Sequence, residues 1–476
     1  MSLAHIKPSF IITVLMVGLL PACAVGPDYK QPNTETPKAF SRAVTPEFSA
    51  HGIEVNWWTL FKDKQLNTLV DQTIHHNLNL KAARANIQEA RALYLQAALN
   101  LAPIVSSHAN YIDQKRSVGA LNNLSYAPRT LKLYNVGFDA QWELDLFGRV
   151  RRSVEASTDE VEIQEATLRD LSVSLIAEVA RNYFELRGLQ NQLAVAKKNT
   201  DNQIKTLEIT QIRLDAGRGT ELDTSRELAQ LESTRALIPP LEAGIYRAIH
   251  RLSVLTGQLP DSLTQTLSQA APLPHIPETI QIGNPAELLR RRPDIRIAER
   301  SLAAATASIG VATADLFPRV TFVGTVALEA SMLSSVGAKG SDAYNLGPRI
   351  SWAALDLGHV YARIKAANAN AESSLAQYQQ TVLTALEETE NALENYNRER
   401  ARQALLASAA QASIKADELA HLRFNEGVSD FLTVLDTELR LLQDQDNLAQ
   451  SETATATALT SVYKALGGGW EVSEFH

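Results

Sequence analysis

Cysteine is almost absent from this chain of 476 residues, which contains a single one, Cys23. An intramolecular disulfide, a cysteine-based metal site and a thiol nucleophile are therefore excluded. Positive charge is not in excess either, since the formal net charge is −8, which argues against nucleic-acid binding. Long hydrophobic runs are missing after residue 22, so membrane insertion of the mature chain requires β-strands or lipid.

The N-terminus has the pattern of a secretory signal peptide. Lys7 supplies a short positive region, and residues 10–20 form an apolar stretch of about 11 residues, shorter than the roughly 20 that cross a membrane. Small residues then precede Cys23, which predicts removal of residues 1–22 and lipid attachment at Cys23. Ala24, in place of Asp, favours the outer membrane. An ordinary signal peptide with an incidental cysteine is the alternative.

The rest of the chain consists of two copies of one unit. A shift of 215 residues places 100–105 on 315–320, and a shift of 210 residues places Gly217 on Gly427. The shift changes only in loops and at a turn, as expected of a duplicated fold. The predicted parts are a lipid-anchored segment at 23–65, a first repeat at 66–258, a linker at 259–285, a second repeat at 286–469 and a tail at 470–476.

Proline and glycine are scarce where the longest helices are expected. No proline occurs between 129 and 238, and residues 359–426 contain no glycine. Apolar residues recur in steps of three and four, which is typical of coiled-coil packing. Rods of about 66 residues would be about 100 Å long. Shorter helices are predicted at 66–101 and 293–316. A fibrous coiled coil would also explain the helices taken alone.

Four other stretches alternate between apolar and polar residues with period two, which predicts strands. They lie at 104–115, 132–143, 319–328 and 346–355, as two hairpins, 104–143 and 319–355. Each is about as long as a strand of a membrane barrel, with apolar faces outward. Four strands cannot close such a barrel, and open edges are not tolerated in lipid. Several chains must therefore share one barrel: two would give 8 strands and three would give 12.

Five short segments together carry a specific family resemblance. They are CAVGPDY at 23–29, WWTLF at 57–61, WELDLFG at 142–148, RRRPDI at 290–295 and DLFP at 315–318. In these segments, and over essentially the whole mature chain, the sequence resembles outer-membrane factors of the TolC and OprM type, in particular the NodT-like efflux lipoproteins.

The resemblance implies a mixed α and β fold, in which a homotrimer shares a 12-stranded transmembrane β-barrel that continues into a long periplasmic α-helical barrel. It implies docking to a periplasmic adaptor (a membrane fusion protein), itself bound to an inner-membrane transporter. It also implies a location in the cell outer membrane, extending into the periplasm, and no cofactor besides the covalent lipid on Cys23.

The turns of the two long helical hairpins are expected at the periplasmic end. Gly217 and Gly427 suit helix C-terminal caps, because glycine adopts a left-handed conformation at little cost. The resemblance implies that both turns bind the adaptor. The expected docking residues are Arg213, Gly217, Arg423 and Gly427. Capping alone would also explain the two glycines.

The segment after the second turn is expected to line the tunnel entrance. The resemblance implies a ring of Asp436 carboxylates near the narrowest point and an apolar constriction at Leu432. The expected periplasmic gate consists of Asp436, Leu432, Phe424, Asp430 and Asp223. Relatives often have Tyr at the position of Phe424 and Asp at that of Thr433. An Asp in the first turns of a helix could instead serve the helix dipole.

These features predict the exit duct of a tripartite efflux system, which passively conducts drugs or other small toxic compounds to the exterior. The alternative within this architecture is a channel for type I protein secretion or polysaccharide export. The alternative outside it is a lipidated coiled-coil scaffold without a channel. The sequence contains no Gly-rich phosphate loop, metalloprotease motif or nucleophile elbow, so no enzymatic activity is expected.

Overall fold

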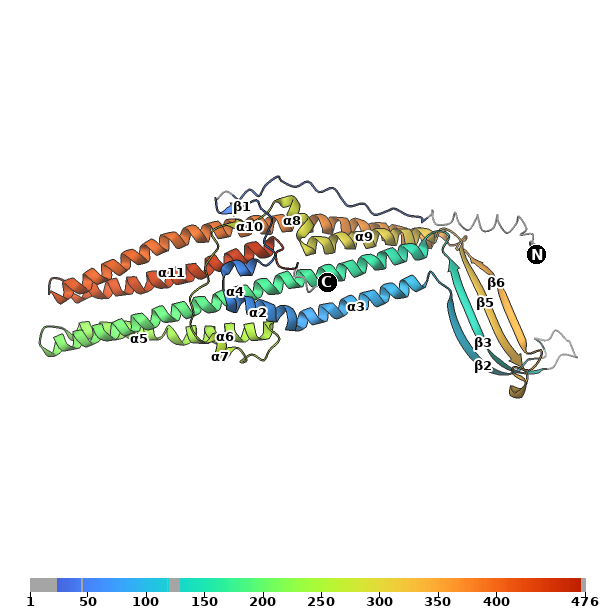
Figure 1. Ribbon diagram of the computed structural model, residues 1–476, viewed down its shortest axis with the longest axis horizontal. Helices are drawn as coiled ribbons and strands as arrows, with labels where there is room; N and C mark the ends of the chain where they lie inside the picture. The colour runs from blue at the N-terminus through green and yellow to red at the C-terminus, as the bar shows by residue number, and fades with distance from the viewer. Residues whose placement is uncertain (1–23, 44–45, 118, 120–128, 472–476) are drawn as a thin grey trace, which may run out of the picture. The chain divides into compact units, whose positions relative to one another are not determined.

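The computed structural model describes residues 24–43, 46–117, 119 and 129–471, in two compact units (Figure 1). The first unit contains Met1–Asn33, Asn86–Glu165 and Ile297–Gln379. The second contains Thr34–Ala85, Ala166–Arg296 and Gln380–His476. Each unit therefore combines segments from both sequence repeats.

The first unit holds a sheet of four strands in the order β2-β3-β5-β6 (Figure 1). All neighbouring strands are antiparallel, and the two predicted hairpins are confirmed. β3 and β5 join them, with Phe138 opposite Val326. The strands are β2 (Ile104–Lys115), β3 (Thr130–Leu144), β5 (Arg319–Ala330) and β6 (Asp342–Ser351), and a short turn of 3-10 helix, η4 (Leu333–Ser335), precedes β6.

The fourth strand was predicted wrongly at 346–355, since β6 begins at Asp342 and ends at Ser351. The ladder ends where Ser351 pairs with Arg319, the first residue of β5. Trp352 follows outside the strand, before a turn at 354–355, and its indole N–H donates a 3.0 Å hydrogen bond to the Leu316 carbonyl. Apolar residues in this turn continued the alternating pattern beyond the true end of the strand.

One face of the sheet is apolar and exposed. Phe138, Val326 and Tyr344 are cross-strand neighbours and are 62%, 59% and 79% exposed. The other face is polar: Asp139 lies 2.6 Å from His108 and accepts a 2.7 Å hydrogen bond from the Thr325 hydroxyl. The period-two pattern thus sorts apolar and polar side chains onto opposite faces.

Helices make up most of both repeats. The first repeat contains α2 (Lys64–His76), α3 (Leu78–Leu99), α4 (Arg149–Asp215), α5 (Glu221–Arg235) and α6 (Ile238–Leu255). The second contains α8 (Pro285–Arg291), α9 (Pro293–Ala314), α10 (Leu357–Asn425) and α11 (Phe431–Ala465). The predicted long helices are confirmed, because α4 has 67 residues and α10 has 69. Within the described part of the chain, no helix combines the length and apolar character needed to cross a membrane.

The single helix predicted at 66–101 is two helices, α2 and α3, separated by Asn77. Asn77 is extended (φ −63°, ψ 128°), and its side chain caps α3 by accepting a 2.9 Å hydrogen bond from the Asn79 N–H. The second repeat breaks at the equivalent residue, Arg292, which has ψ 122° and separates α8 from α9. There Pro293 is the cause, because proline disfavours a helical conformation in the residue before it.

The returning helices of the two hairpins differ. In the first repeat α5 and α6 are separate, and Pro239 and Pro240 lie in the first turn of α6. Proline lacks an N–H donor and clashes with the preceding turn, so the helix cannot continue through this point. In the second repeat α11 runs for 35 residues without interruption.

The core of the second unit includes part of the N-terminal segment. Trp57 of η2 (Trp57–Phe61) is fully buried and stacks on Tyr463 with ring centroids 4.9 Å apart, and Phe61 packs against Phe184 at 4.8 Å. The segment predicted as a linker, 259–285, also carries structure. It forms α7 (Thr264–Leu267) and β4 (Ile280–Gln281), and β4 pairs in parallel with β1 (Phe48–Ser49).

Candidate functional site

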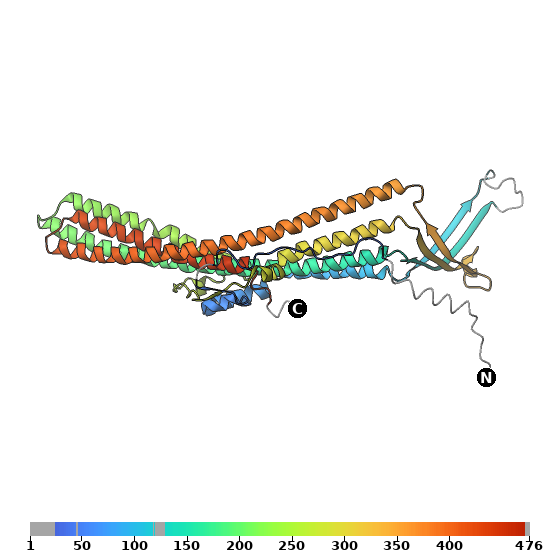
Figure 2. The same cartoon turned by 90° about the horizontal axis from the view of Figure 1, so that it is seen from above.

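The turns between α4 and α5 and between α10 and α11 lie at the same end of the second unit (Figures 1 and 2). In each turn the glycine N–H and the N–H after it bond back to helix carbonyls three and five residues earlier, at 2.8–3.0 Å. Gly217 has φ +67° and Gly427 has φ +74°. Both turns are therefore Schellman caps, which accounts for the two glycines structurally. Their predicted role in adaptor docking stays a prediction.

The two arginines predicted to dock the adaptor have different surroundings. Arg213 donates from Nη2 to the Phe424 carbonyl at 2.9 Å, and its guanidinium lies 3.8 Å from the centroid of the Phe424 ring. It therefore connects the first turn to the second through a hydrogen bond and a cation–π contact. Arg423 is exposed at the surface.

Phe424 lies inside a small apolar cluster at the base of the second turn. It is 7% exposed and packs with Ala420, Phe431 and Val434, with Leu435 at the margin. The Phe424 and Phe431 ring centroids are 5.5 Å apart. This packing closes the α10–α11 turn without the hydroxyl that a tyrosine would supply.

Two of the predicted gate carboxylates cap helices. Asp430 is the N-cap of α11 and accepts from the Thr433 N–H at 3.1 Å and the Thr433 hydroxyl at 2.7 Å. These hydrogen bonds lower the pKa of Asp430. Asp223 forms a capping box with Thr220 at the start of α5. Helix capping thus explains both residues locally.

Asp436 and Leu432 are four residues apart on α11 and therefore share a face of that helix. Asp436 is exposed, and Leu432 is 52% exposed. Neither belongs to the apolar cluster around Phe424 or caps α11. A lining position at the tunnel entrance stays a prediction for both.

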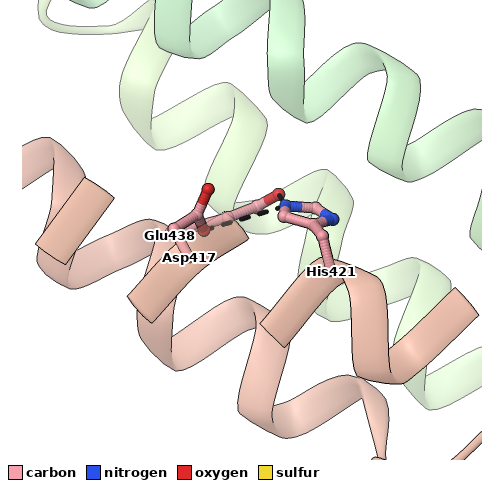
Figure 3. A group of neighbouring side chains, drawn as sticks. All are labelled: Asp417, His421 and Glu438. Atoms are coloured by element: carbon pink, nitrogen blue, oxygen red, sulfur yellow. Dashed lines mark ion pairs between the residues drawn. The ribbon is translucent and has the colours of Figure 1, made fainter. Parts of the chain in front are cut away.

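A cluster of ionisable side chains that the sequence analysis missed lies one to two helical turns above the second turn. Asp417 and His421 of α10 and Glu438 of α11 point toward one another (Figure 3). His421 Nε2 lies 2.9 Å from Glu438 Oε1 and 3.7 Å from Asp417 Oδ1. The spacing of four between Asp417 and His421 was a visible signal. Glu438 could not be placed without the fold.

The first hairpin contributes Glu227 of α5 and Thr206 of α4 to this region. The Thr206 hydroxyl donates to Glu438 Oε1 at 2.8 Å. Glu227 is fully buried and interacts electrostatically with Glu438 and His421. Burial, and next the Glu438 carboxylate, raises the pKa of Glu227 to about 8, while His421 opposes the rise. The hydrogen bond with Glu438 raises the pKa of His421.

Cys23 lies outside the described residues, but the residues that follow it are packed against the first unit. The Val25 N–H donates to the Phe147 carbonyl at 3.0 Å, just after β3. Gly148 has φ +82°, and a Cβ on it would lie 2.6 Å from Ala24. Two of the segments that carry the family resemblance, at 23–29 and 142–148, therefore meet in space.

Comparisons with known proteins agree with this arrangement. The family described as "Outer membrane efflux protein" matches residues 69–258 and 284–468, which correspond to the two repeats. The outer membrane protein OprJ of Pseudomonas aeruginosa is 29% identical over 98% of this chain and 97% of its own length. Nodulation protein T of Rhizobium leguminosarum bv. trifolii is 29% identical over 95% of this chain and 96% of its own. The structure of the outer-membrane channel OprN is 42% identical, with a TM-score of 0.89, and covers 94% of this chain and 100% of that one.

Proposed function

This chain belongs to the outer membrane efflux protein family, and from that premise we propose that it is the exit duct of a tripartite efflux system. It lies in the outer membrane and serves as an efflux channel. Its cargo is drugs or other small toxic compounds, which pass from an inner-membrane pump and a periplasmic adaptor to the exterior without a reaction in this chain. The names of two relatives, an outer membrane protein and an outer-membrane channel, support the location and the channel.

The observation that carries the proposal is the exposed apolar face of the four-stranded sheet. Cross-strand neighbours such as Phe138, Val326 and Tyr344 would be costly in water, and lipid is the environment that suits them. β2 and β6 are the edges of the sheet, and an edge in lipid must be paired. In a homotrimer each β2 pairs with the β6 of a neighbouring chain, which closes a barrel of 12 strands.

A lipid on Cys23 adds a second attachment to the membrane. The contacts of the residues just after Cys23 support this attachment. The Val25 N–H donates to the Phe147 carbonyl just after β3, and Arg152 forms a 2.6 Å ion pair with Asp28. These contacts hold residues 25–28 near the end of β3, so a lipid on Cys23 would be attached only two residues before a segment that packs beside the sheet.

The adaptor docks at the two turns, with Arg213, Gly217, Arg423 and Gly427 as the docking residues. Arg423 is exposed, whereas Arg213 holds Phe424, so adaptor binding at the first turn would compete with an internal contact. Leu432 and Asp436 line the entrance on the exposed face of α11. Three Asp436 carboxylates around a threefold axis would favour cations in the pore.

The test is an efflux assay in the organism that carries the gene. Deletion should raise accumulation of a fluorescent efflux substrate, and the wild-type gene should restore the original level. Purified protein should also conduct ions in planar bilayers. Conductance without an accumulation phenotype would favour secretion of protein or polysaccharide, and the absence of both would overturn the proposal.

A further inference from the structure

The cluster above the second turn has the donor set of a metal site. One imidazole and two carboxylates from α10 and α11 place their ligand atoms within 4.8 Å of one another. Tetrahedral Zn²⁺ has bonds of about 2.0–2.2 Å to nitrogen and oxygen, which sets its ligand atoms about 3.3 Å apart. The separations of 2.9 Å and 3.7 Å from His421 Nε2 lie on either side of that value.

A second and independent observation indicates that a cation binds here. Glu227 is 0% exposed, and both of its carboxylate oxygens lack a hydrogen-bond partner among the described residues. Glu438 Oε2 and Asp417 Oδ1 also lack one within that part of the chain. A buried carboxylate without a donor is costly, and a bound cation would relieve that cost at all three residues. Asp417 and Glu438 belong to the group that His421 joins, and Glu227 interacts electrostatically with Glu438 and His421.

We propose that Asp417, His421 and Glu438 bind one Zn²⁺ ion per chain, next to the buried side chain of Glu227. Glu438 would coordinate through Oε1, the oxygen 2.9 Å from His421 Nε2, and the Thr206 hydroxyl, which donates to the same oxygen, would orient the carboxylate. Two carboxylates and a neutral imidazole carry a formal charge of −2, which a divalent cation neutralises. Mg²⁺ and Ca²⁺ are poorer candidates, because both require about six or more oxygen ligands.

The site would connect the two helical hairpins. The ligands Asp417, His421 and Glu438 belong to the second hairpin, and Thr206 of α4 in the first hairpin donates a hydrogen bond to Glu438. At a shift of 210 residues, Asp417 and His421 correspond to Leu207 and Gln211 in α4, which cannot form an equivalent group. All ligands therefore come from the second hairpin, with the hydrogen bond from Thr206 as the link to the first, and the site does not depend on what the channel transports.

The experiment is a Zn²⁺ titration of the detergent-purified full chain, made without a polyhistidine tag and stripped with a chelator. Isothermal titration should give one Zn²⁺ per chain, and Zn²⁺ should raise the melting temperature, because the metal binds the folded state. His421→Gln and Glu438→Gln should each weaken binding about 100-fold. His359→Gln is the matched control, because His359 forms an exposed ion pair with Asp356 and should leave binding unchanged.

Co²⁺ provides a readout that needs no variant. Co²⁺ bound to the wild-type chain should give the intense visible absorption of a four-coordinate ion, and added Zn²⁺ should abolish it. The proposal is overturned if the wild-type chain binds no Zn²⁺, if His421→Gln binds as tightly as wild type, or if His359→Gln weakens binding equally. Failure of the efflux assay with intact Zn²⁺ binding would contradict the channel function alone.

Discussion

Asn77 and Arg292 occupy equivalent positions in the two repeats, and each forms an extended break between two helices. Asn77 Nδ2 donates to the Leu255 carbonyl at 2.9 Å, and Arg292 Nη1 donates to the Ala465 carbonyl at 2.9 Å. The two carbonyls correspond at the shift of 210 residues. The amide of Asn77 and the guanidinium of Arg292 thus make equivalent hydrogen bonds to the last helix of their own repeats. The two repeats therefore share the backbone arrangement although the residue differs.

The helices after the two turns, α5 and α11, also begin with equivalent caps made by different residues. In the first repeat the N-cap is Thr220 and its partner three residues later is Asp223. In the second repeat the N-cap is Asp430 and the partner is Thr433. The carboxylate and the hydroxyl have exchanged places and still satisfy the start of the helix. Thr433 thus takes part in the cap of α11 as the donor to Asp430.

The largest expected effect is on stability, and it distinguishes Arg292 from Asn77, the two residues at the helix breaks. Arg292 is buried and bonds to Asp294, Glu388 and the Ala465 carbonyl, so Arg292→Ala should lower the free energy of unfolding by about 2–3 kcal/mol. Asn77→Ala loses a cap and one buried hydrogen bond, about 1–2 kcal/mol. Thermal or denaturant unfolding measures both changes.

Arg290→Ala is the control for these two variants, because Arg290 is exposed on α8 and its removal should change stability by less than about 0.5 kcal/mol. Equal losses in Arg292→Ala and Asn77→Ala would contradict the expected difference between a buried guanidinium and an amide.

Replacement of the glycine should lower stability by the same amount in both Schellman turns. Gly217→Ala and Gly427→Ala each place a Cβ on a residue with positive φ, which should cost about 1 kcal/mol in either repeat. Gly358 has no contacts that a Cβ would disturb, so Gly358→Ala should be neutral or slightly stabilising. A large cost at only one of the two turns would show that their backbones are not equivalent.

Much of this fold was predictable, and the exceptions have physical reasons. Period-two alternation located β3, and the absence of proline located α4. The break at Asn77 was missed, because asparagine is tolerated within helices and the apolar pattern continues through it. The contact of Arg213 with Phe424 joins residues 211 positions apart. No local pattern encodes such a contact, and the same holds for Glu227 in the ionisable cluster.

A smaller effect should distinguish the two arginines of the turns. Arg213→Ala removes a cation–π contact and a hydrogen bond, so protection from hydrogen exchange around Phe424 should fall by about 1 kcal/mol. Arg423→Ala should leave protection unchanged and weaken binding of the adaptor. Equal loss of protection in both variants would mean that Arg423 also holds the turn.

Asp436 has no acidic counterpart, because the shift of 210 residues places it on Arg226. Asp436→Ala should reduce cation selectivity in planar bilayers, and Asp436→Arg should shift it toward anions, with little change in stability. The reversal potential under a salt gradient is the measurement. Wild-type values in both variants would place Asp436 away from the lumen.

The smallest effect is expected at Cys23, which precedes the first repeat and has no equivalent in the second. Cys23→Ser should remove the lipid and leave efflux nearly unchanged, because the strands also hold the chain in the membrane. Mass spectrometry of the mature N-terminus reads the modification. An unmodified Cys23 in the wild-type protein would contradict lipid attachment.

Native mass spectrometry of the wild-type protein, released from detergent, tests the shared barrel most directly. Each chain contributes four strands with two edges, so we expect an assembly of three chains and no stable smaller species. A stable monomer that forms a pore in planar bilayers would contradict the account.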